Sequence, residues 1–177
     1  DSESDEVFKL AEGRLHKDLK RDPSLATNKT DGNQLLLNEA SKVDADIYLQ
    51  ALPTSPFLSE ETINEAVFKL IISNENDSLF AVKKGKKYLW NEDESPANYD
   101  PLNIPNSVDL KDTIVETMGL YLIRKEILFK RNSRIGDKPI LFDIPFIETI
   151  DIDNLEDFQF AEVVYSGLEV LKNERRL

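Results

Sequence analysis

Two short polar segments carry residue types that could bind a nucleotide or a metal ion. One is Pro-Thr-Ser-Pro at 53–56, and the other is Asp-Ile-Asp at 151–153. In the first segment, the hydroxyls and the backbone N–H groups that lead into the next helix could hold an anion or the edge of a base. The alternative interpretation is an ordinary turn, because Pro and Ser are common turn residues.

In the second segment, Asp151 and Asp153 have the side chains that could bind a metal or take part in catalysis. We expect them at the end of a strand, where alternation would point both carboxylates the same way and bury Ile152 on the other face. Two convergent carboxylates repel each other unless a cation lies between them. Mg²⁺ suits such a pair because it takes few protein oxygens and shares the rest with water and phosphate. The alternative is that Asp153 caps the last helix and Asp151 is solvated.

Composition excludes several other kinds of chemistry. The chain has no cysteine, which rules out disulfides, zinc–thiolate sites and thiol nucleophiles. The single histidine, His16, lies in a polar stretch typical of surface residues, and one histidine does not favour a multi-histidine metal site or a Ser-His-Asp triad. A net charge of −12 argues against a nucleic-acid partner, which would need clustered cations. Catalysis would therefore depend on carboxylates, a metal or an activated substrate.

The elements that would position the two segments alternate between strands and helices. Apolar runs predict strands at 46–50, 78–82, 115–123 and 139–144. Helical spacing predicts helices at 3–12, 31–42, from 59 onward, 124–130 and 154–172. This alternation is typical of βαβ units, so we predict an α/β fold with a mostly parallel sheet and flanking helices. Ligands of such sheets bind beyond the carboxyl ends of the strands, where both polar segments fall.

The size of the chain fits one domain, since 177 residues can bury a sizeable core. No apolar run approaches the roughly 20 residues needed to span a bilayer. The acidic N-terminus is unlike a signal peptide, and the lack of cysteine fits a bacterial cytoplasm. We therefore expect a cytoplasmic protein with no membrane partner.

Residues 83–112 differ from the rest of the chain. They are rich in Lys, Asn, Asp and Pro and show little helical periodicity. A structureless loop of this length is uncommon inside a compact domain, so we expect an excursion with short strands and a function of its own.

In this order, the motifs resemble the acylneuraminate (CMP-sialic acid) cytidylyltransferase family. The specific segments are Leu52-Pro53-Thr54-Ser55-Pro56 and Ile147-Glu148-Thr149-Ile150-Asp151-Ile152-Asp153. Four further segments support the resemblance: Asp1-Ser2-Glu3, the run from Arg21 to Ala26, Asp109-Leu110 and the run from Glu116 to Tyr121. The similarity therefore covers nearly the whole chain. The resemblance implies a Rossmann-like domain that transfers CMP from CTP to a keto-sugar acid, with Mg²⁺ as cofactor and pyrophosphate as product. It also implies a homodimer.

The resemblance assigns roles to individual positions. Asp151 and Asp153 would be catalytic and bind Mg²⁺. The nucleotide would contact Thr54, Ser55 and Arg21, and the sugar acid would contact Gln50, Glu116, Thr117 and Tyr121. Residues 83–112 would form the dimerisation arm.

The chain also departs from the family pattern. The glycine- and lysine-rich loop that grips the triphosphate would precede residue 1, so we expect an N-terminally incomplete domain with little or no turnover as it stands. The family glutamine before Pro-Thr-Ser-Pro reads Leu52, and Asn-Gly after Glu116 reads Thr117-Met118. Lys86 or Lys87 would contact the sugar carboxylate. Two alternatives stay open: a non-catalytic homologue kept as a binding or dimerisation module, and a nucleotidyltransferase for another nucleotide or sugar.

Overall fold

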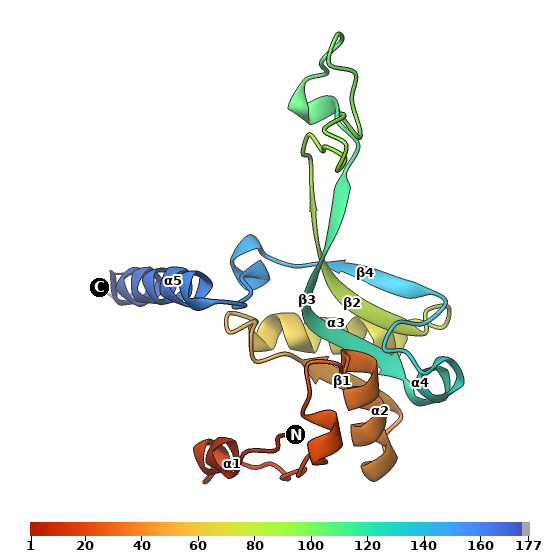
Figure 1. Cartoon of the computed structure of the whole chain (residues 1–177), viewed down its shortest axis with the longest axis vertical. Helices are drawn as coiled ribbons and strands as arrows, with labels where there is room; N and C mark the ends of the chain where they lie inside the picture. Colours follow the sequence, from red (N-terminus) through yellow and green to blue (C-terminus); the bar gives the residue numbers. More distant parts are fainter. Residues whose placement is uncertain (175–177) are drawn as a thin grey trace. The chain divides into compact units, whose positions relative to one another are not determined.

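Helices and strands alternate along the chain in this computed structural model, which describes residues 1–174 (Figure 1). The helices are α1 (Asp5–Ala11), α2 (Gly32–Lys42), α3 (Glu60–Ile72), α4 (Lys125–Arg131) and α5 (Leu155–Glu174). The strands are β1 (Ile47–Ala51), β2 (Ser78–Gly85), β3 (Thr113–Arg124) and β4 (Pro139–Asp143), and the 3₁₀ turns are η1 (Pro23–Leu25), η2 (Ser107–Asp109) and η3 (Phe146–Thr149). Each helix and strand lies close to its predicted range. Within residues 1–174 no helix combines the length and the apolar character needed to cross a membrane.

The four strands form one sheet in the order β1-β3-β2-β4. β2 and β4 run parallel, because the N–H of Asp77 donates to the carbonyl of Lys138 and, further along both strands, the N–H of Ile144 donates to the carbonyl of Val82. Two backbone hydrogen bonds show that β3 runs opposite to β1: Leu52 N–H to Gly119 C=O, and Lys125 N–H to Asp46 C=O. The sheet is therefore partly parallel. The predicted α/β class, with a sheet and flanking helices, is confirmed.

The chain divides into two compact units. Unit 1 comprises 1–50, 67–79 and 121–140, and unit 2 comprises 51–66, 80–120 and the chain from 141 on. The boundary crosses the strands, so each unit contains a section of all four.

The core of unit 1 joins α2 and α4 to the strands. Leu36 and Ala40 of α2 are buried with Tyr48 of β1, Ile123 of β3 and Leu128 of α4. Burial of these apolar side chains removes them from water and fixes α2 against β1. The N-terminus of α2 is closed by a capping box between Asp31 and Gln34, which satisfies two backbone N–H groups.

In unit 2, the segment 86–112 leaves the sheet between β2 and β3 and returns to it (Figure 1). Among the described residues it contains isolated bridges, Trp90 with Pro96 and Asp100 with Asn103, rather than the expected short strands. Tyr99 packs edge-on against Tyr88 and Trp90, with ring centroids 4.8 Å and 6.3 Å away. The segment therefore has an aromatic cluster of its own.

Candidate functional site

The two polar segments singled out in the sequence lie side by side in unit 2. The N–H of Ile152 donates to the carbonyl of Thr54 over 2.9 Å, which joins the Asp-Ile-Asp segment to the 53–56 loop. The loop begins directly after β1 and closes as a turn, with the N–H of Ser55 donating to the carbonyl of Leu52 over 3.1 Å. Residues about 100 positions apart in the sequence are thus joined by a backbone hydrogen bond.

The side chain of Ser55 packs against β3 at Gly119. Ser55 is buried, and a Cβ atom at Gly119 would lie only 2.5 Å from the Ser55 Oγ. A larger residue at 119 would push the loop away, so glycine is required by this close approach. Thr54 is half-buried, while Ser55 fixes the position of the loop.

Asp151 lines a cavity of about 410 Å³ in unit 2. Its Oδ1 atom is buried and has no hydrogen-bond partner. Buried polar atoms are nearly always hydrogen-bonded, because an unpaired one loses its water without compensation. Asp151 thus lies in the cavity wall and has one buried, unpaired acceptor oxygen, and such a carboxylate fits a site that a cation or a donor group would complete.

The rest of the cavity wall carries lysines, hydroxyls, a second carboxylate and a few apolar side chains. The residues that line it with Asp151 are Lys83, Lys84, Gly85, Lys87, Thr113, Val115, Glu116, Thr117, Met118, Phe146 and Thr149. Although the chain is acidic as a whole, three cations gather here, which favours an anionic ligand.

One of the three lysines is held by an acidic residue. Lys83 Nζ donates to Asp143 Oδ1 over 3.1 Å and to the carbonyl of Ile144 over 2.8 Å. The backbone N–H of Lys84 also donates to Asp143 Oδ1, over 2.8 Å, and this bond contributes most to lowering the pKa of Asp143. The ammonium groups of Lys84 and Lys87 form no ion pair with any residue in the described part of the chain. These two lysines are available to a ligand.

Asp153 is placed differently from Asp151. The chain before it forms the 3₁₀ turn η3 instead of a strand, so the expectation that strand alternation aligns the two carboxylates is wrong. Asp153 is exposed. Nor does it cap α5: the Oδ1 of Asn154 accepts from the N–H groups of Glu156 (2.9 Å) and Asp157 (3.1 Å).

Glu148 is a buried acid that the sequence did not single out as a site residue. Its Oε1 accepts a hydrogen bond from the Ser59 hydroxyl over 2.8 Å, and its Oε2 is buried without a partner. Ser59 also accepts from the N–H of Thr62 and so caps α3. Glu148, which precedes Asp151 by three residues in the sequence, therefore links η3 to the start of α3.

Met118 holds a backbone conformation that suits glycine. Its φ is +61°, in the left-handed region, and its side chain lines the Asp151 cavity. The preceding residue, Thr117, donates its hydroxyl to the carbonyl of Ala81 over 3.1 Å. The sequence resemblance led us to expect a glycine at 118, and the φ of Met118 lies in the region that glycine favours.

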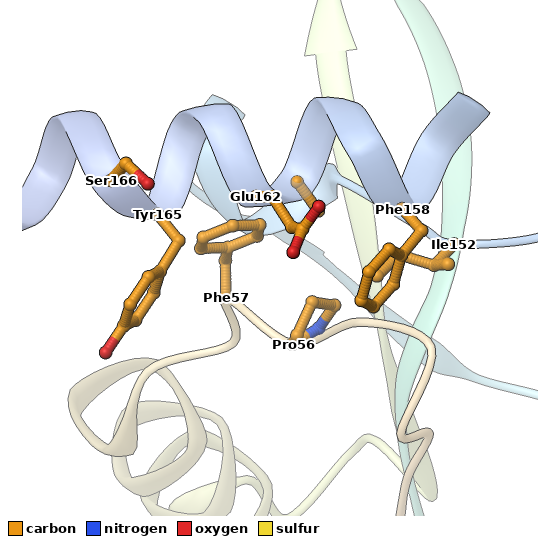
Figure 2. Close-up of a pocket in the computed structure, with 8 residues that line it drawn as sticks. Pro56, Phe57, Ile152, Phe158, Glu162, Tyr165 and Ser166 are labelled. Carbon is orange, nitrogen blue, oxygen red and sulfur yellow. The ribbon is translucent and has the colours of Figure 1, made fainter. Parts of the chain in front are cut away.

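A second cavity in unit 2, of about 340 Å³, lies between α5 and the turn that follows the 53–56 loop (Figure 2). Figure 2 shows Pro56 and Phe57 on the loop side, with Phe158 and Tyr165 projecting from α5. Of the described residues that line it, Glu162 is the one with an acidic side chain, and none is a lysine or an arginine. This apolar, weakly acidic cavity does not suit a phosphate.

Gln50 and Tyr121, two of the residues assigned to sugar binding, belong to unit 1 and share a contact with Arg134. Arg134 Nη1 donates to Gln50 Oε1 over 3.0 Å, and the guanidinium carbon lies 3.6 Å from the centroid of the Tyr121 ring. Tyr121 is fully buried and Gln50 nearly so. Arg134 carries no sequence signal, because it lies in a polar loop outside the motifs described above.

Arg21, assigned to the nucleotide, pairs with acids at the start of unit 1. It contacts Asp1 over 2.9 Å and Glu3 over 3.3 Å.

No protein-family model and no curated protein matches the sequence. Solved structures do match the fold. The 4-diphosphocytidyl-2C-methyl-D-erythritol synthase of Anaerococcus prevotii matches with a TM-score of 0.61 and 16% identity, over 93% of this chain and 77% of that one. A CMP:2-keto-3-deoxy-manno-octonic acid synthetase, solved in complex with CTP, matches with a TM-score of 0.52 and 13% identity, over 79% and 70%.

The chain shares the fold of cytidylyltransferases. At these identities the likeness extends to the fold alone, and it does not single out the acylneuraminate branch.

Proposed function

We propose that the protein is a cytidylyltransferase that transfers CMP from CTP to a keto-sugar acid and releases pyrophosphate. The proposal rests on one observation above all: Asp151, which has a buried and unpaired carboxylate oxygen, lies in the wall of a cavity that three lysines line. The shared fold supports it, because the two neighbours named above are a diphosphocytidyl synthase and a CMP-sugar-acid synthetase.

The residues of the cavity have complementary roles in this proposal. Lys84 and Lys87 would bind the anionic groups of the substrates, and Glu116 would lie on the sugar side. Thr54 and Ser55, in the loop bonded to Ile152, would hold the nucleotide side. A sugar hydroxyl would attack the α-phosphorus, losing its proton to water as the new P–O bond forms and the bond to pyrophosphate breaks. Such a reaction needs alignment and charge neutralisation more than a covalent nucleophile, which agrees with the absence of cysteine.

Mg²⁺ is the cofactor that the acidic residues would fit. Asp151 has a free acceptor oxygen, and Asp153 follows it two residues later. Residues 1–174 contain no cluster of three acidic or histidine side chains placed for a metal, so most ligands would be phosphate oxygens and water, as Mg²⁺ prefers. When bound, the ion would neutralise charge on the transferred phosphate.

A homodimer is the assembly we propose, with the segment 86–112 as its arm. Four apolar residues of this segment are strongly exposed: Trp90 (60%), Leu102 (90%), Ile104 (65%) and Val108 (72%). Exposed apolar groups gathered on one segment mark an interaction surface. We propose the cytoplasm as the location of this reaction.

Pyrophosphate release tests the proposed activity. The full-length gene product would be incubated with CTP, Mg²⁺ and a panel of keto-sugar acids that includes 2-keto-3-deoxy-manno-octonic acid. We expect release with at least one acid, and a loss of about a hundred-fold or more in Asp151→Asn, because phosphoryl-transfer enzymes depend strongly on charge neutralisation at the reacting phosphate. Asp18→Asn, at an exposed aspartate of unit 1, is the matched control and should keep full activity.

No pyrophosphate release with any of the acids, from a protein that folds normally, would contradict the proposed activity. Mg²⁺-dependent stabilisation by CTP would then separate the two remaining alternatives. Its presence would indicate a nucleotidyltransferase for another acceptor, and its absence a non-catalytic binding module.

A further inference from the structure

Three aromatic side chains line the cavity between α5 and the turn that follows the 53–56 loop. Phe57 comes from the turn, and Phe158 and Tyr165 project from α5 (Figure 2). The described residues that line this cavity all belong to unit 2, so its geometry is set within one compact unit. Its volume of about 340 Å³ is within the range of small-molecule sites.

The spacing of residues along α5 explains how the cavity forms. Phe158, Ala161, Glu162 and Tyr165 lie on one face of the helix, because residues three and four positions apart are neighbours on a helix surface. Ala161 is buried and has only a methyl group. It therefore leaves space between the two rings that flank it.

The aromatic rings of the cavity do not stack on one another. Phe158 is 48% exposed and Tyr165 is 60% exposed. Within residues 1–174, none of the three rings belongs to a ring pair or to a cation–π contact. Their faces can therefore contact a ligand, and exposed apolar groups gathered around a cavity mark a binding site.

Glu162 gives the cavity a negative charge. Its side chain points from α5 toward the turn at Pro56 (Figure 2). In the part of the chain that the structure describes, Glu162 takes part in no ion pair. The faces of aromatic rings are also negative. The carboxylate and the rings together attract a cation and repel an anion.

We propose that this cavity binds an organic cation, an alkylated ammonium group attached to an apolar body. The rings would surround the ammonium group, and Glu162 would neutralise its charge. A metal ion such as Mg²⁺ or Ca²⁺ suits the cavity less well, because it requires several oxygen ligands. The inference goes beyond CMP transfer and does not depend on it, since the described residues that line this cavity and those that line the Asp151 cavity are different.

A matched pair of probes tests the preference for charge. Choline and 3,3-dimethylbutan-1-ol have the same shape, but only choline is charged. The full-length gene product, with isotope-labelled Phe and Tyr rings, would be titrated with each probe and followed by NMR. We expect choline to shift the ring signals of Phe57, Phe158 and Tyr165, and to bind at least about five-fold more tightly than the alcohol. The ring of Phe160, which is on α5 but outside the cavity, should not shift.

Two pairs of variants separate the ring from the carboxylate. Tyr165→Leu should weaken choline binding by about three- to ten-fold, whereas Tyr165→Phe keeps the ring and should retain most of the affinity. Glu162→Gln should weaken binding of choline by about as much and leave binding of the alcohol unchanged. Phe160→Leu and Glu156→Gln, at matched residue types of α5 outside the cavity, are the controls and should bind choline like the wild type. All four positions are exposed, so the melting temperature should be kept.

The results would decide this inference separately from the proposed function. No choline binding, equal binding of the two probes, or the same affinity in Tyr165→Leu and Phe160→Leu would overturn the cation site. Ring signals that shift with protein concentration alone would also overturn it, because a second copy of the chain would then cover the cavity. Pyrophosphate release from CTP does not enter any of these measurements, so a failure here leaves CMP transfer to its own test.

Discussion

At the scale of single residues, Met118 lines the cavity in a strained backbone conformation that lowers the stability of the fold. A bulky residue with a φ of +61° is strained by about 1–2 kcal/mol, because its Cβ approaches the backbone. We predict that Met118→Gly leaves the free energy of unfolding unchanged or raises it by up to about 1 kcal/mol, since relief of strain offsets the added flexibility of the unfolded chain. Urea unfolding measures this.

Val115 gives the matched control for that prediction. It is also an exposed residue of β3 in the cavity wall, but its φ is not positive. Val115→Gly should therefore lose about 1 kcal/mol, because glycine weakens a strand interior. Equal losses in the two variants would show that Met118 is unstrained.

Residue types could be recognised from the sequence more readily than their surroundings. Thr54 could be predicted as a site residue because it lies in a loop after a predicted strand, and Asp151 because it belongs to a pair of acids in the sequence. Arg134 and Glu148 could not. Their importance comes from hydrogen bonds to Gln50 and Ser59, which are distant in the sequence. It also comes from their burial, which cannot be predicted for residues in a polar loop or a 3₁₀ turn.

At the scale of elements, the start of α5 provides a test of helix capping. Asn154 accepts two backbone hydrogen bonds of the first turn, and the side chain of Asp153 accepts none among the described contacts. We predict that Asn154→Ala lowers the free energy of unfolding by about 1 kcal/mol, the usual cost of losing an N-cap. Asp153→Ala should cost clearly less, and the reverse order in thermal or urea unfolding would contradict the assignment.

The regular elements could be predicted from periodicity, while the segment before Asp151 could not. The segment from Phe146 leads into the alternating Asp151-Ile152-Asp153, which indicated the end of a strand. Local bonds decide otherwise: the Thr149 hydroxyl donates to the carbonyl of Phe146 over 2.7 Å, and the N–H of Glu148 donates to the carbonyl of Pro145 over 3.0 Å. Short-range hydrogen bonds of this kind compete with strand pairing, and an alternating pattern does not reveal them.

At the scale of the whole molecule, two copies can associate only if their contacts outweigh the repulsion between their negative charges. Each chain carries a net charge of −12, so two copies repel one another over roughly 8–10 Å at ordinary ionic strength. Contacts that hold a dimer must then come from apolar surface, and the segment 86–112 exposes six large apolar side chains. This is the physical basis for expecting the arm, rather than the acidic surface, to join two copies.

Charged substitutions in the arm test that expectation. Leu102→Lys and Ile104→Lys, combined, place two cations at positions that are 90% and 65% exposed in one chain, so folding should be unaffected. Burying each apolar side chain in an interface is worth about 1.5–3 kcal/mol, and the double variant should weaken the dimer at least a hundred-fold. Leu15→Lys, at another fully exposed leucine outside the arm, is the control and should leave the dimer intact. Sedimentation velocity measures both, and a double variant that sediments as the wild-type dimer would mean that the arm serves a different partner.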